Sequence, residues 1–173
     1  SENAQRIHNS NGRSMSVTVK GLDAALKNLD KQEDIVIDAV KDILARVATD
    51  IEFEATLNAP NSYQIGDKTI NLNFIGQKIN KKASNNGLFW NVGLDVPSTG
   101  EQWEAWMEFG TGLSAEQILG RAGYTSEIKA QADKFFRTGK GRIIGKPYMM
   151  PAFFRNTANL VQEIENEINK DLK

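Results

Sequence analysis

Three glutamates beside a cluster of aromatic residues have a spacing that could support acid–base or metal chemistry: Glu101, Glu104 and Glu108. Paired carboxylates can cleave glycosidic bonds, and clustered ones can hold a metal ion for nuclease chemistry. No histidine and no second acidic motif accompanies these glutamates. We therefore interpret them as strand residues that alternate or lie on the solvated side, and we expect neither reaction.

The glycine-rich stretch over 139–147 resembles a phosphate-binding loop only at first sight. A Walker loop requires the pattern Gly-x4-Gly-Lys-Ser/Thr. Ahead of Gly145-Lys146, the required glycine position holds Lys140, and Pro147 replaces the metal-binding hydroxyl. The stretch is interpreted as a basic loop broken by glycines, without a nucleotide site.

The residues needed for nucleophilic catalysis are also missing. Thr111, Ser114 and Ser126 have no histidine base, because the only histidine is His8 in the polar N-terminal stretch. The chain has no cysteine, which excludes thiolate metal sites and cysteine nucleophiles. We expect no enzyme, no catalytic residue, no metal and no cofactor.

The length of 173 residues and the mass of 19.2 kDa suit one domain. The net charge of −1 argues against a protein that binds nucleic acid through its overall charge. No apolar run is long enough for a membrane span, so no membrane contact is expected. Residues 1–14 contain one strongly apolar side chain, and we interpret them as a flexible arm or as residues added for expression ahead of Met15. A single domain is predicted over 15–173.

The first half of that domain is predicted to be mostly helical. A short extended stretch over 16–20 precedes a helix with leucines at helical spacing over 22–29. A longer helix over about 32–58 has an apolar stripe at steps of three and four, and Pro60 ends it. Residues 21–57 contain four basic and nine acidic side chains, a local charge of −5.

Strand signals follow the long helix. Residues 61–68 are interpreted mainly as loop, while 75–83 and 88–96 are predicted to pair through a hairpin turn at Asn86-Gly87. Alternating apolar residues predict a third strand over 102–109. On that strand Trp106 would lie beside Glu104 and Glu108, on the face opposite the other aromatic residues.

The last third of the chain combines a basic insert with a helix. Residues 112–146 are predicted to be loop-rich, and 125–146 contain six basic and two acidic residues, a local charge of +4. The basic residues are Lys129, Lys134, Arg137, Lys140, Arg142 and Lys146. Pro151 suits the first turn of an amphipathic C-terminal helix. The predicted fold class is α+β: a small antiparallel sheet of three or four strands against a long N-terminal helix and a C-terminal helix.

Aromatic doublets such as Phe89-Trp90 and Phe153-Phe154 cannot both point inward on a regular element. Some of these rings must face a loop, solvent or another subunit. Aromatic residues with Met149-Met150 beside them are typical of oligomer interfaces. The unlike charges of the long helix and the insert also suit association between copies, although solvated charge is the default explanation.

Two ordered motifs carry a resemblance to a known family. A Gly-Leu helix over 21–29 comes first, and a long helix then ends in Ala59-Pro60. A later strand finishes in aromatic-x-Glu-Phe-Gly-Thr at 106–111, and a Pro-aromatic-x-x-Pro-Ala motif at 147–152 precedes the last helix. In this order the features resemble the tail-completion, or head–tail joining, proteins of long-tailed bacteriophages and prophages. The residues of the two motifs are Trp106, Glu108, Phe109, Gly110, Thr111, Pro147, Tyr148 and Pro151.

The resemblance implies a non-enzymatic structural role in the virion neck, with assembly in the cytoplasm of the bacterial host. Its implied partners are other copies in a ring and the connector, tail-tube or terminator proteins of the phage. Both motifs are interpreted as junctions that determine the fold, with contact between ring subunits as the second interpretation. A tail terminator or a minor capsid or neck component is the alternative role. The basic residues over 129–146 suggest a further hypothesis, in which they face genomic DNA in the channel without reading its sequence.

Overall fold

The computed structural model describes residues 14–19, 34–97, 100–111, 125–126, 129–130 and 143–171. Nearly all of the predicted arm, the predicted helix over 22–29 and most of the basic insert lie outside these ranges. The remaining elements combine helices with two small antiparallel sheets, which confirms the predicted α+β class.

The long helix α2, Asp34–Asn58, is the central element of the fold. Its buried side chains recur at steps of three and four through Val40, Leu44, Val47 and Ile51. This spacing places them on one face of the helix, as the apolar stripe predicts. The predicted helix is therefore confirmed, with its end two residues before Pro60.

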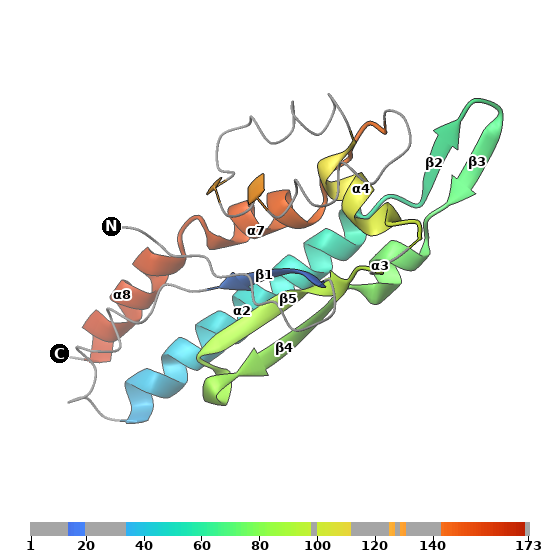
Figure 1. Cartoon of the computed structure of the whole chain (residues 1–173). Coiled ribbons are helices and arrows are strands. Elements are labelled where there is room, and N and C mark those ends of the chain that lie inside the picture. Colours follow the sequence, from blue (N-terminus) through green and yellow to red (C-terminus); the bar gives the residue numbers. More distant parts are fainter. Residues whose placement is uncertain are drawn as a thin grey trace.

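A three-stranded sheet lies against this face of α2 (Figure 1). The strand order is β1 (Ser14–Val19), β5 (Phe89–Asp95), β4 (Asn80–Ser84), and both pairs are antiparallel. The β4–β5 turn passes through η1 (Asn85–Gly87), where both asparagines and the glycine have positive φ. The hairpin predicted at the Asn-Gly pair is thus confirmed, and β5 confirms the predicted strand over 88–96.

Two strand predictions are wrong. The stretch predicted as a strand over 75–83 begins instead with helix α3, Phe74–Lys78, and only its second part is β4. The stretch predicted as a third strand over 102–109 is helix α4, Trp103–Phe109. All seven residues of α4 are buried, so its sequence has no solvated face to reveal a helical period. The third strand of the sheet is the N-terminal β1.

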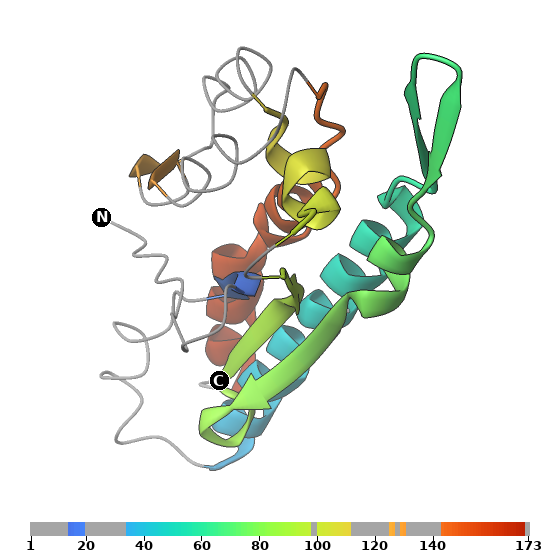
Figure 2. The same cartoon turned by 45° about the vertical axis from the view of Figure 1, so that its right-hand side comes forward.

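A second sheet occupies residues that were predicted as loop. Strands β2 (Ser62–Ile65) and β3 (Lys68–Asn71) form an antiparallel hairpin. Gly66, in the turn between them, has a φ of 57°, which favours glycine. Figures 1 and 2 show this hairpin projecting from the molecule beyond the end of α2. The loop prediction is wrong. Each strand has only four residues, most of them polar, so the sequence shows no clear alternation of apolar and polar side chains.

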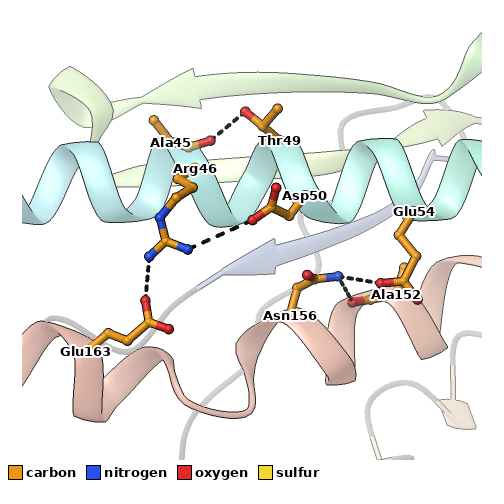
Figure 3. Close-up of polar contacts among 8 residues, drawn as sticks. All are labelled: Ala45, Arg46, Thr49, Asp50, Glu54, Ala152, Asn156 and Glu163. Atoms are coloured by element: carbon orange, nitrogen blue, oxygen red, sulfur yellow. Dashed lines mark hydrogen bonds and ion pairs between the residues drawn. The ribbon is translucent and has the colours of Figure 1, made fainter.

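The C-terminal region forms two helices in place of the one predicted, α7 (Met149–Thr157) and α8 (Leu160–Asp171). Both pack along α2, and polar contacts tie them to it (Figure 3). Arg46 of α2 forms an ion pair with Glu163 of α8. Glu54 of α2 accepts hydrogen bonds from Arg155 and, at 2.8 Å, from Asn156 of α7. Within the described residues, no helix is both long and apolar enough to cross a bilayer.

Candidate functional site

The Glu-Phe-Gly-Thr motif forms the end of the buried helix α4. Gly110 terminates the helix with a φ of 73° and donates its N–H to the carbonyl of Trp106 at 2.7 Å. Phe109 anchors this end in the core, with 4% of its surface exposed. Trp106 is also buried and packs edge-to-face on Trp103, with ring centroids 5.3 Å apart. The prediction that Trp106 and its neighbouring glutamates lie on a solvated face is therefore wrong.

Thr111 links this motif to the chain beyond the basic insert. Its N–H donates to the carbonyl of Ile143 at 3.0 Å, and its hydroxyl accepts the N–H of Ile143 at 2.7 Å. Both residues are buried. The two hydrogen bonds hold residues 111 and 143 side by side, although they are 32 positions apart in the sequence.

Glu108 connects the two sequence motifs directly. Its carboxylate accepts the backbone N–H groups of Tyr148 and Met149 at 2.8 Å each, and that of Met150 at 3.0 Å. These N–H groups belong to the first turn of α7, where a helix leaves its donors without intrahelical partners. A negative charge there is also favoured by the helix dipole. Glu108 thus caps α7 from forty residues away, and we call the α4–α7 contact around it the Glu108 junction.

The side chain of Glu108 is fully buried. Burial raises the pKa of Glu108 above its ordinary value, while the three N–H donors act in the opposite direction. The carboxylate uses both of its oxygens on backbone donors inside the protein. It is therefore placed to organise the chain and cannot reach a substrate in solvent.

The Pro-aromatic-x-x-Pro-Ala motif supplies the other side of the junction. Tyr148 is fully buried and donates its hydroxyl to the carbonyl of Glu104 at 3.1 Å. Burial, followed by the nearby charges of Glu108 and Glu104, raises the pKa of Tyr148 well above its ordinary value. The half-buried Pro147 precedes Tyr148, and Pro151 lies in the first turn of α7 as predicted. The residues over 143–148 run in irregular backbone, while Met149 is already helical.

Glu104, the second carboxylate of the sequence cluster, serves a different contact. It is buried and pairs at 2.7 Å with the ammonium group of Lys78, which also lies over the ring of Phe74. Glu101 accepts a hydrogen bond from the indole of Trp103 at 2.8 Å. The three glutamates therefore have separate partners. Among the described residues, no group of three or more acidic or histidine side chains could hold a metal ion.

The structure locates only part of the predicted DNA-facing set. Lys129 and Lys146 are exposed. Lys134, Arg137, Lys140 and Arg142 lie outside the described residues. The DNA-facing role of these residues stays a prediction.

Sequence reasoning singled out both motifs but missed that they meet at one carboxylate. The position of Glu108 next to Phe109 and near Trp106 was the available signal. A glutamate buried among aromatic residues requires several hydrogen-bond partners, which the sequence could have prompted us to seek. The hairpin was missed as well, although Gly66-Asp67 between two four-residue stretches is a recognisable turn. No protein-family model, no curated protein and no solved structure matches this chain.

Proposed function

We propose that this chain is a non-enzymatic structural subunit of a tailed bacteriophage or prophage, which joins or completes the tail where it meets the head. One observation carries the proposal. The two motifs on which the family resemblance depends form a single buried unit, in which Glu108 of the first motif caps the helix that begins in the second. Their joint occurrence in the sequence then has a physical reason, because each motif requires the other.

The chemistry of the carboxylates supports a structural role over an enzymatic one. Glu108 is occupied by backbone donors, and Glu104 by a lysine. Both are buried, so neither can act on a substrate from solvent. Among the described residues, the exposed side chains include large apolar ones, such as Phe53 and Leu57 on α2 at 68% and 72% exposure. Exposed apolar side chains of this size suit contact with other proteins.

In the proposed role the subunit forms a ring with other copies against the connector and tail-tube or terminator proteins. We expect the free protein to be monomeric or weakly associated, because the ring contacts are completed only on the neighbouring components. Light scattering of the purified chain mixed with connector or tail-tube proteins tests this. A complex of defined mass is the expected result, and no complex with any of them would contradict the proposal.

A matched pair of variants sharpens the experiment. Phe53→Asp with Leu57→Asp places two charges on the exposed apolar face of α2, while Gln162→Asp with Glu165→Gln alters exposed positions of α8 without adding net charge. In a phage or prophage that lacks the gene, we expect the wild-type chain and the α8 variant to restore joined particles. The α2 variant should leave heads and tails separate. Equal restoration by both variants would exclude this face from the assembly contact.

The alternative roles differ in where the protein is found. A tail terminator would remain on tails purified without heads, and a minor capsid component would remain on heads purified without tails. A DNA-contacting channel protein would lose binding when Arg137, Lys140 and Arg142 are replaced by alanine. Immunogold labelling of separated heads, tails and joined particles distinguishes the first two from the proposed position at the joint.

A further inference from the structure

The β2–β3 hairpin is the one sheet of the described structure that lacks a third strand, and its outer end projects from the main body (Figure 2). Isolated two-stranded hairpins are only marginally stable in water, and three strands or packing against a helix are needed for independent stability. Here the register is nevertheless well defined, with Ser62 opposite Asn71 and Gln64 opposite Thr69. The Thr69 hydroxyl also donates to the Gln64 side chain at 2.8 Å.

The alternation of the ladder determines which backbone groups point outward. Leu72 donates its N–H to the carbonyl of Asn61 at 2.8 Å, so positions 61 and 72 form a hydrogen-bonded pair. In an antiparallel ladder such pairs alternate with pairs whose N–H and C=O groups point away from each other. Ser62 and Gln64 on one edge, and Thr69 and Asn71 on the other, therefore present outward-facing backbone groups. Within the described part of the chain, no further strand pairs with either edge.

The two sheets protect their edges differently. The edge strand β4 carries Lys81, which is tied to Glu52 of α2, and the exposed Lys82. Lysines on an edge strand discourage pairing with other chains. The hairpin has a single lysine, Lys68, directly beside the turn, and no proline within either strand. Its edges are otherwise uncharged, as is the β1 edge of the three-stranded sheet, so no other charge opposes pairing there.

The face of the hairpin that meets the body continues outward to one apolar and one charged side chain, Ile65 and Lys68, which lie opposite each other. Tyr63 and Ile70 lie opposite each other, partly buried against the core. Ile65 lies on the same face, two residues farther out, and is 49% exposed. Ile144, whose N–H donates to the Tyr63 hydroxyl at 2.9 Å, is 59% exposed. A strand added at the edge would extend this face and cover part of the exposed isoleucine surface.

We propose that the β2–β3 hairpin pairs edge to edge with the hairpin of a second copy of this chain. The unpaired backbone groups specify the kind of partner, an extended strand. A second copy offers such a strand with the same length and, on β2, an uncharged edge. Pairing to β4 of a second copy would instead meet an edge protected by lysines. The inference deepens the proposed function, because it names a contact through which the subunits associate.

The test uses the purified full-length chain, so that its outcome is independent of any phage component. Thr69→Pro removes an outward N–H, and proline is tolerated at an edge position whose N–H faces solvent. Thr69→Val is the matched control, because it loses the same hydroxyl but keeps the N–H. Sedimentation equilibrium should show weak self-association of the wild-type chain and of Thr69→Val. We expect Thr69→Pro to weaken it about tenfold or more in a two-fold β3–β3 contact, since each of the two copies then loses one backbone hydrogen bond.

Further variants identify the edge and guard against misfolding. Thr69→Lys, which reproduces the lysine protection of β4, should weaken association even if the proline variant folds poorly. Ser62→Pro tests the other edge in the same way. Loss with the Thr69 variants alone indicates a two-fold β3–β3 contact, loss with Ser62→Pro alone a two-fold β2–β2 contact, and loss with both a head-to-tail contact suited to a ring.

Two results would overturn the inference. The first is a wild-type chain that stays monomeric up to about 1 mM, the concentration at which a contact of about 4 kcal/mol is half formed. The second is association that none of the edge variants changes. Failure of the proposed phage role would be seen separately, as normal self-association of a chain that never enters particles.

Discussion

The Glu108 junction and the β2–β3 hairpin treat backbone polar groups in opposite ways. In the junction, three N–H groups at the start of α7 are all satisfied by one buried carboxylate of the same chain. In the hairpin, alternate backbone groups of both strands point away from the ladder. The first region completes its hydrogen bonding during folding, while the second leaves its edges for a partner. The comparison separates residues that stabilise the subunit from residues that can join subunits.

The largest effect is expected from removing the carboxylate. Glu108→Ala leaves three buried N–H groups without an acceptor, and we expect the free energy of unfolding to fall by about 2–4 kcal/mol. Chemical denaturation followed by circular dichroism measures this. Glu165→Ala, at an exposed position of α8, should change stability by about 0.5 kcal/mol or less. Equal effects of the two substitutions would show that Glu108 contributes no more to stability than an exposed side chain does.

The pH dependence of the junction should follow the raised pKa of Glu108. Its pKa in the folded state lies above the ordinary value of 4.5, mainly because of burial. Such a carboxyl stabilises the fold fully below its unfolded pKa, and this stability is lost as the pH rises through the folded pKa. Relative to Glu108→Gln, which does not titrate, the wild-type chain should therefore lose stability as the pH rises from about 4. A difference that grows in favour of the wild type with pH would show that the N–H donors outweigh burial.

A smaller effect is expected in the hairpin turn. Gly66 has a φ of 57°, and a Cβ built there would meet no atom within 4 Å. Gly66→Ala should therefore cost only the conformational strain of a left-handed alanine, about 1 kcal/mol. Asparagine tolerates this conformation better, so Gly66→Asn should recover part of the loss. Hydrogen exchange of the hairpin amides is the sensitive measurement, and we expect exchange at the Glu108 junction to stay unchanged.

The smallest effect is expected on the helix surface. Arg155 pairs with Glu54, but its side chain is 69% exposed, and Asn156 also donates to the same carboxylate. Solvent screens such a pair, so Arg155→Ala should cost about 0.5 kcal/mol or less. Thermal denaturation at low and high salt checks this. A loss comparable to that of Glu108→Ala would mean that the contacts between α2 and α7 depend on surface charge more than on the buried junction.

The parts of the fold that sequence periodicity could predict are those with one buried and one solvated face. Helix α2 shows its period because most of its outer face is polar, and β5 shows its alternation because apolar residues alternate in sequence with Asn91, Gly93 and Asp95. Helix α4 lies entirely inside the protein, so its sequence contains no contrast between faces. Its alternating tryptophans and alanine then suggested a strand. The strand prediction failed because α4 is buried on all sides, which only the tertiary structure reveals.

The sequence could predict which residues form the candidate site, but not the contact between Glu108 and the start of α7. The aromatic and glycine residues of the two motifs indicated structural junctions, and Gly110 does take a positive φ. The contact between Glu108 and the start of α7 spans forty residues, and no local pattern records a capping group so distant in the chain. The hairpin at 62–71 has only four residues in each strand, with polar side chains on most positions. Strands this short and polar resemble a loop in sequence.

The reciprocal hydrogen bonds between Thr111 and Ile143 have a practical consequence for engineering this chain. Because they keep the two flanking residues adjacent, the length of the sequence between them can change without moving α4 or the start of α7. Doubling the length of a closed loop costs only about 0.6 kcal/mol in entropy. An epitope or a fluorescent domain inserted there would report on the protein inside cells while leaving its folded frame intact.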